Sequence, residues 1–144
     1  MKENTGPRPP GLDKDIVFDA GVLSIWYSGD RRPRAFFQAV EEGRSRGHIS
    51  GVNLAEFYYK TCQKVGRQSA DTWYYQAVES GLLVSSGEGI DRSAGLEKCR
   101  HPTLSIADCF ALALAKREGA LLLTTDGELA KVREVRAKHF TVGP

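Results

Sequence analysis

The sequence predicts a three-layer α/β domain, in which helices cover both faces of a central, mostly parallel sheet of four to five strands. Two observations support this prediction. Short apolar runs alternate along the chain with longer segments of helical periodicity, which is the order that strand–helix–strand units produce. The 144 residues correspond to one domain and are enough to bury a single hydrophobic core.

The first half of the chain alternates strands with helices. Pro33 suits the first turn of a helix, and Gly66 suits the position just after one. Apolar residues recur at helical spacing between Ala70 and Val78, which predicts an amphipathic helix. The expected elements are a strand over Ile16–Phe18, a short helix after it, a helix from about Pro33, a strand over His48–Ser50, a helix over Leu54–Val65 and the helix around 70–78.

The second half continues the alternation. The nearly all-apolar run from Ile106 to Glu118 predicts a helix that Gly119 ends, and the apolar run after it predicts a buried strand. The expected elements are a strand over 82–86, a helix over 89–101, the helix over Ile106–Glu118, a strand over Ala120–Thr125, a helix over Glu128–Val135 and a strand over Phe140–Val142.

Composition limits the classes of function. Lys and Arg number 20 against 18 Asp and Glu, so a nucleic-acid-binding role must rest on where charges lie rather than on bulk charge. The three cysteines lack a CxxC motif, which indicates reduced thiols and a cytoplasmic protein. Cys99 and His101 are close in sequence but lack the further ligands of a zinc site, so none is expected there.

The N-terminal segment differs in composition from the rest. Residues 1–13 are rich in Pro, Gly and charge and are expected to form a flexible arm before a folded domain over 14–144. They lack the apolar stretch of a signal peptide. No apolar run is long enough to span a membrane, so no membrane partner is expected.

Four acidic residues are expected to meet at one edge of the sheet. Asp19 ends the first strand and Asp126 ends the strand over 120–125, while Glu56 and Asp108 are placed in the first turns of helices. In a parallel sheet, strand carboxyl ends and the amino ends of the following helices share the edge where ligands bind. These four residues are therefore the candidate catalytic and metal-binding residues.

The proximity of four carboxylates would raise their pKa values, because like charges oppose ionisation. A bound cation resolves this conflict, and all-oxygen ligation suits Mg²⁺ or Mn²⁺ rather than Zn²⁺. The chemistry expected of such a site is activation of a water and stabilisation of negative charge on a phosphoryl group.

A structural alternative stays open for three of the acids taken singly. Asn53-x-x-Glu56 and Ser105-x-x-Asp108 both resemble capping boxes, and Asp126 suits a turn. Asp19, by contrast, has no local partner evident in the sequence. The conjunction of four acids at one edge favours the site over the caps.

Three segments resemble a known family. IVFDAGVL (16–23), VNLAEFYYK (52–60) and LSIADCFALALAKREGALLLTTD (104–126) resemble, in order and separation, the PIN domain and in particular the VapC-type toxin ribonucleases of type II toxin–antitoxin pairs. The resemblance extends from Asp15 to the C-terminus and is most specific in the third segment.

This resemblance implies a function, cofactors and partners. Asp19, Glu56, Asp108 and Asp126 would bind Mg²⁺ or Mn²⁺, and a metal-activated water would hydrolyse RNA phosphodiester bonds, making the chain an endoribonuclease. The family also implies a homodimer inhibited by a cognate antitoxin that inserts a peptide near the acids. The residues expected to support the acids are Asn53, Ser105, Thr124 and Thr125.

One position departs from the family pattern. Many members follow the first acid with Thr or Ser, whereas here Asp19 is followed by Ala20 and Gly21, which predicts weakened metal binding. A catalytically degenerate PIN domain that binds RNA or a peptide stays open as an alternative. A phosphoacceptor signalling domain is a third hypothesis, but FDAG offers only one of the paired acids that it needs.

Basic side chains are candidates for holding the RNA backbone, because phosphates are contacted mainly by Lys and Arg. The candidates are Arg31, Arg32, Arg34 and Lys60. The alternative for each one is an ordinary solvated surface charge.

Overall fold

A five-stranded sheet forms the centre of the computed structural model, which describes residues 13–87 and 89–143. All neighbouring strands are parallel, in the order β3-β2-β1-β4-β5. The strands are β1 (Asp15–Phe18), β2 (Arg46–Ser50), β3 (Leu83–Ser85), β4 (Leu121–Thr124) and β5 (Ala137–His139). The predicted α/β class and parallel sheet are confirmed.

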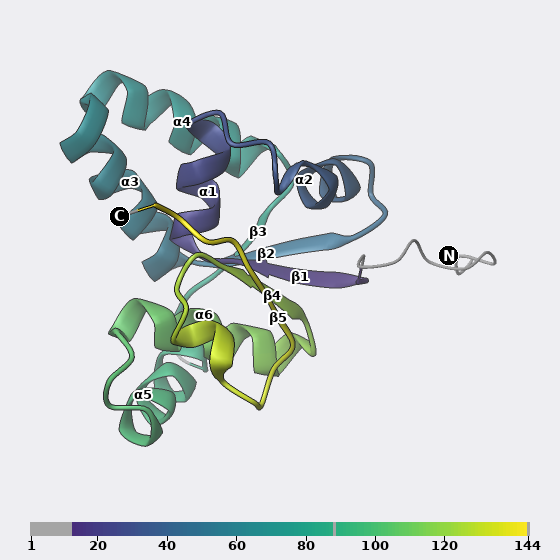
Figure 1. The fold of residues 1–144 in the computed structure, drawn as a ribbon, viewed down its shortest axis with the longest axis vertical. Coiled ribbons are helices and arrows are strands. Elements are labelled where there is room, and N and C mark those ends of the chain that lie inside the picture. Colours follow the sequence, from purple (N-terminus) through teal and green to yellow (C-terminus); the bar gives the residue numbers. More distant parts are fainter. Residues whose placement is uncertain (1–12, 88, 144) are drawn as a thin grey trace.

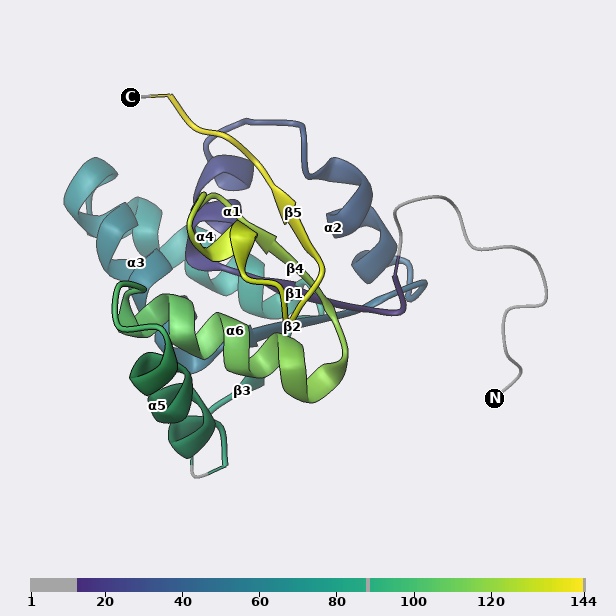
Figure 2. The ribbon, with the colours of Figure 1, turned by 60° about the horizontal axis from the view of Figure 1, so that its bottom comes forward.

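Helices cover both faces of this sheet. Figure 1 shows α1 to α4 on one side and α5 with α6 on the other, and Figure 2 shows α5 lying beside α6. The helices are α1 (Ala20–Tyr27), α2 (Arg34–Glu41), α3 (Gly51–Val65), α4 (Arg67–Glu79), α5 (Ile90–Arg100), α6 (Ile106–Glu118) and the 3₁₀-helix η1 (Leu129–Lys131). The three predicted layers are therefore present.

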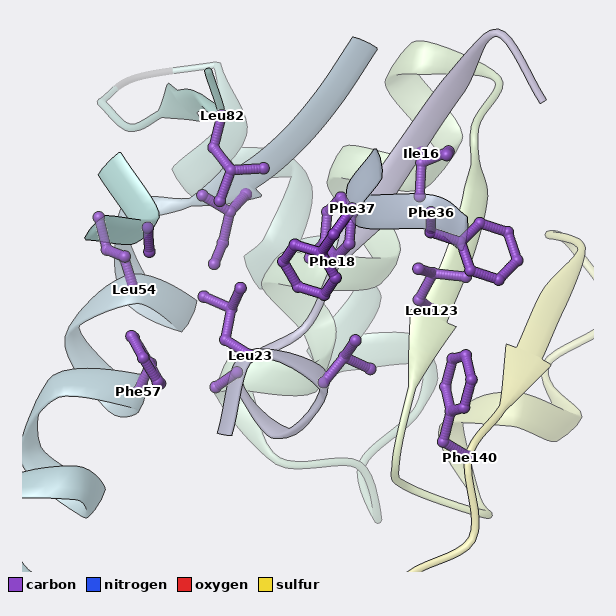
Figure 3. Packing of buried hydrophobic residues seen from close by; sticks show 14 of the residues in the cluster. Ile16, Phe18, Leu23, Phe36, Phe37, Leu54, Phe57, Leu82, Leu123 and Phe140 are labelled. Carbon is purple, nitrogen blue, oxygen red and sulfur yellow. The ribbon is translucent and has the colours of Figure 1, made fainter. Parts of the chain in front are cut away.

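The central strands are apolar on both faces because each face packs against a helical layer. In β1, Ile16 and Phe18 belong to the core cluster under α1 to α4, while Val17 belongs to the cluster under α5 and α6. β4 alternates in the same way, and Figure 3 shows Leu123 converging with aromatic rings of the first cluster. Each fully buried side chain of this kind contributes about 1.5–3 kcal/mol. The central strands are therefore held between the two clusters, one on each face of the sheet.

The strand order locates the edge at which a site can form. From β1 the chain crosses to β2 on one side, and it later returns to β4 on the other side of β1. Loops at the carboxyl ends of β1 and β4 therefore diverge from a common point, which is where open parallel sheets bind ligands.

Two predicted elements near the C-terminus are wrong. The helix expected over Glu128–Val135 is only the three-residue η1, because Val132 already has an extended backbone (φ −67°, ψ 126°). The strand expected over Phe140–Val142 lies three residues earlier, since β5 ends at His139. Phe140 was misleading because its buried ring packs edge-on against Phe36 in the core rather than marking a strand.

The predicted flexible arm falls on residues outside the described part of the chain, apart from Asp13. The carboxylate of Asp13 pairs with Arg136 at 2.9 Å, and its carbonyl accepts the hydroxyl of Ser45 at 2.6 Å. Among the helices of residues 13–87 and 89–143, none has the length and apolar character needed to cross a bilayer.

Candidate active site

Asp19 leads directly from β1 into α1 and caps that helix. Its Oδ1 accepts the N–H of Val22 at 2.8 Å, and its Oδ2 accepts the hydroxyl of Thr124 and the N–H of Thr125 at 3.2 Å. Burial raises the pKa of this carboxyl, which these donors oppose and the charge of Glu56 reinforces. The sequence showed no local partner for Asp19, but the structure gives it one in the N–H of Val22, because α1 begins with no intervening loop.

Thr124 on β4 supplies Asp19 with the hydroxyl donor that Ala20 cannot provide. Ala20 is buried in the core, while Thr124 donates its hydroxyl to Asp19 and accepts the N–H of Asp126 at 2.9 Å. Close packing explains the glycine at position 21, because a Cβ there would lie 1.9 Å from Oγ1 of Thr125. Asp19 thus has three donors without a hydroxyl at position 20, and the weakened metal binding inferred from Ala20 stays a prediction.

The helix that carries Glu56 begins three residues earlier than predicted. Ser50 caps α3 by accepting the N–H of Asn53 at 3.0 Å, and its hydroxyl donates to Oδ1 of Asn53 at 2.6 Å. Glu56 therefore lies in the second turn, and its predicted capping box with Asn53 is wrong. Asn53 instead donates its Nδ2 to the carbonyl of Ala107 at 3.0 Å, which ties α3 to the first turn of α6.

Asp108 lies in that first turn, as predicted. The hydroxyl of Ser105 caps α6 by accepting the N–H of Asp108 at 3.0 Å. Burial and then the charge of Asp126 raise the pKa of Asp108 to about 6, with smaller contributions from Asp19 and Glu56, while a hydrogen bond from Ser105 lowers it. A cap and a perturbed carboxyl thus coexist in one motif.

Asp126 follows β4 and also has a local role. Its Oδ1 accepts the N–H of Leu129 at 2.8 Å and so holds the turn that leads into η1. The turn role considered for Asp126 is confirmed, and it leaves the charge of the carboxylate in place to act on Asp108.

The structure therefore brings four carboxylates to the carboxyl edge of the sheet, where Asp126, Asp19 and Glu56 all raise the pKa of Asp108 and Glu56 also raises that of Asp19. Among the described residues, one ion pair reaches this group, from Lys60 to Glu56 at 3.1 Å. The local charge is negative and incompletely compensated, which is the condition that a divalent cation relieves.

The donor set fits Mg²⁺ or Mn²⁺. All four groups offer hard carboxylate oxygens and no thiolate or imidazole. In the part of the chain that the structure describes, no three of these acids bring oxygens within 4.8 Å of one another. Mg²⁺ keeps several of its waters and takes only one or two protein carboxylates directly, so the wider spacing suits it.

The predicted basic contacts fall into two groups. Lys60 lies at the acidic edge through its pair with Glu56. Arg31 and Arg32 follow α1, whose eight residues span about 12 Å from Asp19. The guanidinium of Arg31 lies over the Trp26 ring at 4.5 Å, and Arg32 binds Asp30 at 2.7 Å and the carbonyl of Thr141 at 2.8 Å.

Arg34 is exposed in the first turn of α2. The structure thus places Lys60 at the acids and the three arginines beyond the far end of α1.

Ser50 is the supporting residue that sequence reasoning missed. A serine that follows an apolar strand and precedes a helical run is a common helix-start signal, and the sequence carries that signal at Ser50. The tie from Asn53 to Ala107 had no such signal, because it joins residues 54 positions apart.

Comparisons with solved structures find similar folds. VapBC2 from Rickettsia felis, bound to a promoter DNA fragment, is similar with a TM-score of 0.70 at 12% identity, covering 88% of this chain and 98% of that chain. VapC20 from Mycobacterium tuberculosis, a toxin that cleaves the sarcin–ricin loop, has a TM-score of 0.64 at 19% identity, covering 84% and 98%. A toxin–antitoxin complex from Klebsiella pneumoniae has a TM-score of 0.63 at 19% identity, covering 88% and 99%.

At such identities these structures show a shared fold. A comparison with curated protein sequences found no match. The family model described as PIN domain matches residues 16–135, which include β2, β3, β4 and all of β1 except Asp15, and which end before β5. On this match, the chain belongs to the PIN-domain family.

Proposed function

We propose that this chain is a Mg²⁺- or Mn²⁺-dependent endoribonuclease that hydrolyses RNA phosphodiester bonds and acts as the toxin of a toxin–antitoxin pair. The observation that carries the proposal is the convergence of Asp19, Glu56, Asp108 and Asp126 at the point where the strand order reverses. Perturbed carboxyl groups at such an edge are typical of catalytic sites.

Each acid has a distinct support, which makes the arrangement suitable for catalysis. Both oxygens of Asp19 are fixed by donors, so its carboxylate is oriented before any ligand arrives. Asp108 is held on a capped helix end, and the buried link from Asn53 to Ala107 fixes that end against α3. The hydroxyl of Thr124 joins Asp19 to Asp126.

These four acids would hold the cation. When bound, it supplies polarisation of an attacking water and neutralises charge that develops on the phosphoryl oxygens. Asp108, with a pKa of about 6, is mostly ionised at neutral pH in the metal-free protein and is ready to bind.

Lys60 is the proposed contact for the scissile phosphate. Its ammonium group is paired with Glu56, so a cation that binds Glu56 would release Lys60 toward the substrate. Arg31 and Arg34 are proposed to contact phosphates farther along the strand. Arg32 is a weaker candidate, because Asp30 and the carbonyl of Thr141 already occupy it.

The choice of RNA and of an antitoxin partner draws its support from the relatives. One similar structure is of a toxin that cleaves the sarcin–ricin loop, and another is of a toxin–antitoxin complex. An antitoxin would bind near the acids through a basic side chain, and the toxin would act as a homodimer in the cytoplasm, where its substrate is. Light scattering with and without a co-expressed antitoxin measures both associations.

Cleavage of total cellular RNA by the purified protein tests the proposal. Wild type and Asp108→Asn are incubated with Mg²⁺, Mn²⁺ or EDTA, and the products are resolved on a sequencing gel. We expect discrete products that require metal and fall by at least about 100-fold in the variant, because one charge of the site is lost. Asp91→Asn, which removes an exposed carboxylate on α5, serves as the matched control and should cleave like wild type.

Two results would contradict the proposal. Full cleavage by Asp108→Asn would remove that residue from the site. Inactive wild type that also fails to bind Mn²⁺ in calorimetric titration would favour a degenerate domain that binds RNA or a peptide.

A further inference from the structure

A second group of ligand-type side chains lies away from the four acids, between α5, the end of α6 and the segment before β5. Glu97 is in the last turns of α5, His101 directly follows that helix, and Glu134 comes from the segment between η1 and β5. One ligand atom from each lies within 4.8 Å of the others. Residues 33 positions apart in the sequence thus meet at one point.

Glu97 carries an unsatisfied buried atom at this point. The residue is 4% exposed, and its Oε2 pairs with Nζ of Lys116 at 2.7 Å. Its Oε1 is buried and has no hydrogen-bond partner, although it faces Nε2 of His101 at 3.8 Å. A buried acceptor without a hydrogen bond costs about 1–3 kcal/mol, and a bound ion is one explanation for such an atom.

The spacing of the three ligand atoms matches a metal site. Nε2 of His101 lies 3.1 Å from Oε2 of Glu134 and 3.8 Å from Oε1 of Glu97. With bonds of 2.0–2.1 Å in tetrahedral geometry, neighbouring ligand atoms are about 3.3 Å apart. The observed distances lie on either side of this value, so small side-chain rotations would complete the geometry.

We propose that Glu97, His101 and Glu134 form a binding site for a divalent transition metal, with Zn²⁺ as the preferred ion. Imidazole nitrogen suits Zn²⁺ and disfavours Mg²⁺, which separates this site chemically from the all-oxygen edge. Three protein ligands leave a fourth position for water. The two carboxylates supply the negative charge that the dication would neutralise, while Lys116 pairs with the other oxygen of Glu97.

The surroundings allow an ion to reach this site. Side chains of His101 and Glu134 are 25% and 41% exposed, whereas Glu97 is buried behind them. Glu134 and Lys116 also line a surface hollow of about 380 Å³, together with Arg133 and Arg136. The site is thus open on one side and anchored on the other, as a metal site requires.

A second cluster of two acids and one histidine lies elsewhere in the described part of the chain. Asp15, His48 and Glu118 also bring ligand atoms within 4.8 Å. There, however, Arg46 binds both carboxylate oxygens of Asp15, at 2.7 and 2.8 Å. A metal would have to displace that guanidinium, whereas Oε1 of Glu97 has no hydrogen bond to lose.

Metal binding here would have a structural consequence. The segment from Asp126 to Glu134 begins at the acidic edge and ends at the proposed site. In it, Glu128 also accepts the hydroxyl of Thr103, close to His101. A metal bound by Glu134 and α5 would therefore fix the far end of the segment that carries Asp126.

Calorimetric titration of the full chain with Zn²⁺, in a large excess of Mg²⁺ that occupies the all-oxygen edge, tests the proposal. We expect one Zn²⁺ per chain, and at least about 10-fold weaker binding in His101→Gln and in Glu134→Gln. Because both side chains are partly exposed, these variants should keep the fold, which thermal unfolding without metal verifies. In wild type, NMR should show that Zn²⁺ shifts the ring signals of His101 at lower concentrations than those of His48 and His139.

Cys99→Ser is the matched control, since this exposed thiol lies two residues from His101 and is the other zinc ligand nearby in sequence. It should bind Zn²⁺ like wild type. The proposal is overturned if wild type binds no Zn²⁺. It is equally overturned if His101→Gln and Glu134→Gln bind as tightly as wild type, or if Cys99→Ser abolishes binding.

Discussion

The two edges of the sheet treat carboxylates in opposite ways. At the amino edge, Asp15 is the direct cross-strand neighbour of Arg46, which binds both of its oxygens, and His48 adds a contact at 2.9 Å. The hydrogen bond from Arg46 is the main reason that the pKa of Asp15 falls to about 2. At the carboxyl edge, burial and Asp126 raise the pKa of Asp108 to about 6.

This difference separates structural from functional charge. A carboxylate satisfied within the chain stabilises the fold and has little left for a ligand. A carboxylate placed beside others, with Lys60 as the nearby cation, costs stability in the free protein and gains it back only when a cation binds. The amino edge therefore serves the fold, and the carboxyl edge is available for chemistry.

The largest expected effect comes from the same substitution made at both edges. Asp126→Asn should lower metal-dependent RNA cleavage by at least about 100-fold while the free energy of unfolding stays within about 0.5 kcal/mol, because asparagine can still accept the N–H of Leu129. Asp15→Asn should lower the free energy of unfolding by about 2 kcal/mol, through weaker bonds from Arg46 and His48, and leave cleavage unchanged.

Urea denaturation and a timed cleavage assay on both variants make this comparison. The separation of roles fails if Asp15→Asn loses cleavage at a temperature where it is fully folded. It fails equally if Asp126→Asn cleaves normally and is only destabilised.

A smaller effect is expected from the close packing at the carboxyl edge. Gly21→Ala places a methyl group 1.9 Å from Oγ1 of Thr125, whose N–H holds Asp19. Overpacking of this kind costs about 1–3 kcal/mol, and it should also lower cleavage by displacing Thr125. Thermal unfolding and the cleavage assay measure the two effects.

Adding Thr125→Ala to Gly21→Ala provides the control, because it removes the colliding oxygen. Most of the lost stability should return in the double variant. If Gly21→Ala alone is as stable and active as wild type, the glycine has no steric role at this edge.

Much of the carboxyl edge could be predicted from the sequence because topology, not packing detail, brings those residues together. Asp19 and Asp126 end strands, Asp108 starts a helix, and parallel order places all such positions on one edge. The exact start of α3 was missed, since Ser50 rather than Asn53 caps it. Asp19 also caps α1, because it is the single residue between the end of β1 and the start of that helix.

The features that could not be predicted depend on how distant segments pack. The cluster of Glu97, His101 and Glu134 forms only because the chain after η1 lies against α5 and α6, and nothing local in sequence reports that contact. β5 was misplaced for a similar reason, because its position follows pairing with Leu122–Thr124 rather than the apolar character of Phe140. At Phe140 the side chain is buried like that of a core strand, but the strand itself ends one residue earlier, at His139.

The smallest expected effect is on the pH dependence of metal-free stability, and it has opposite signs at the two edges. The folded-state pKa of Asp108 lies above its ordinary value of 3.8, so its contribution is fully present below about pH 4 and is lost as pH rises through about 6. The folded-state pKa of Asp15 lies below 3.8, so its contribution is present above about pH 4 and is lost as pH falls toward about 2.

Asp108→Asn in EDTA should therefore be more stable than wild type at pH 8, by about 1 kcal/mol once solvent screening of this partly exposed group is considered. The advantage should shrink as pH falls from about 6 and disappear below about pH 3, where Asp108 is protonated in both the folded and the unfolded state. Saturating Mg²⁺ should reverse the order at pH 8, because wild type gains binding energy that the variant lacks. Urea denaturation at several pH values measures these differences, and a variant that is less stable than wild type at pH 8 in EDTA would show that the charge of Asp108 is compensated within the chain, as that of Asp15 is.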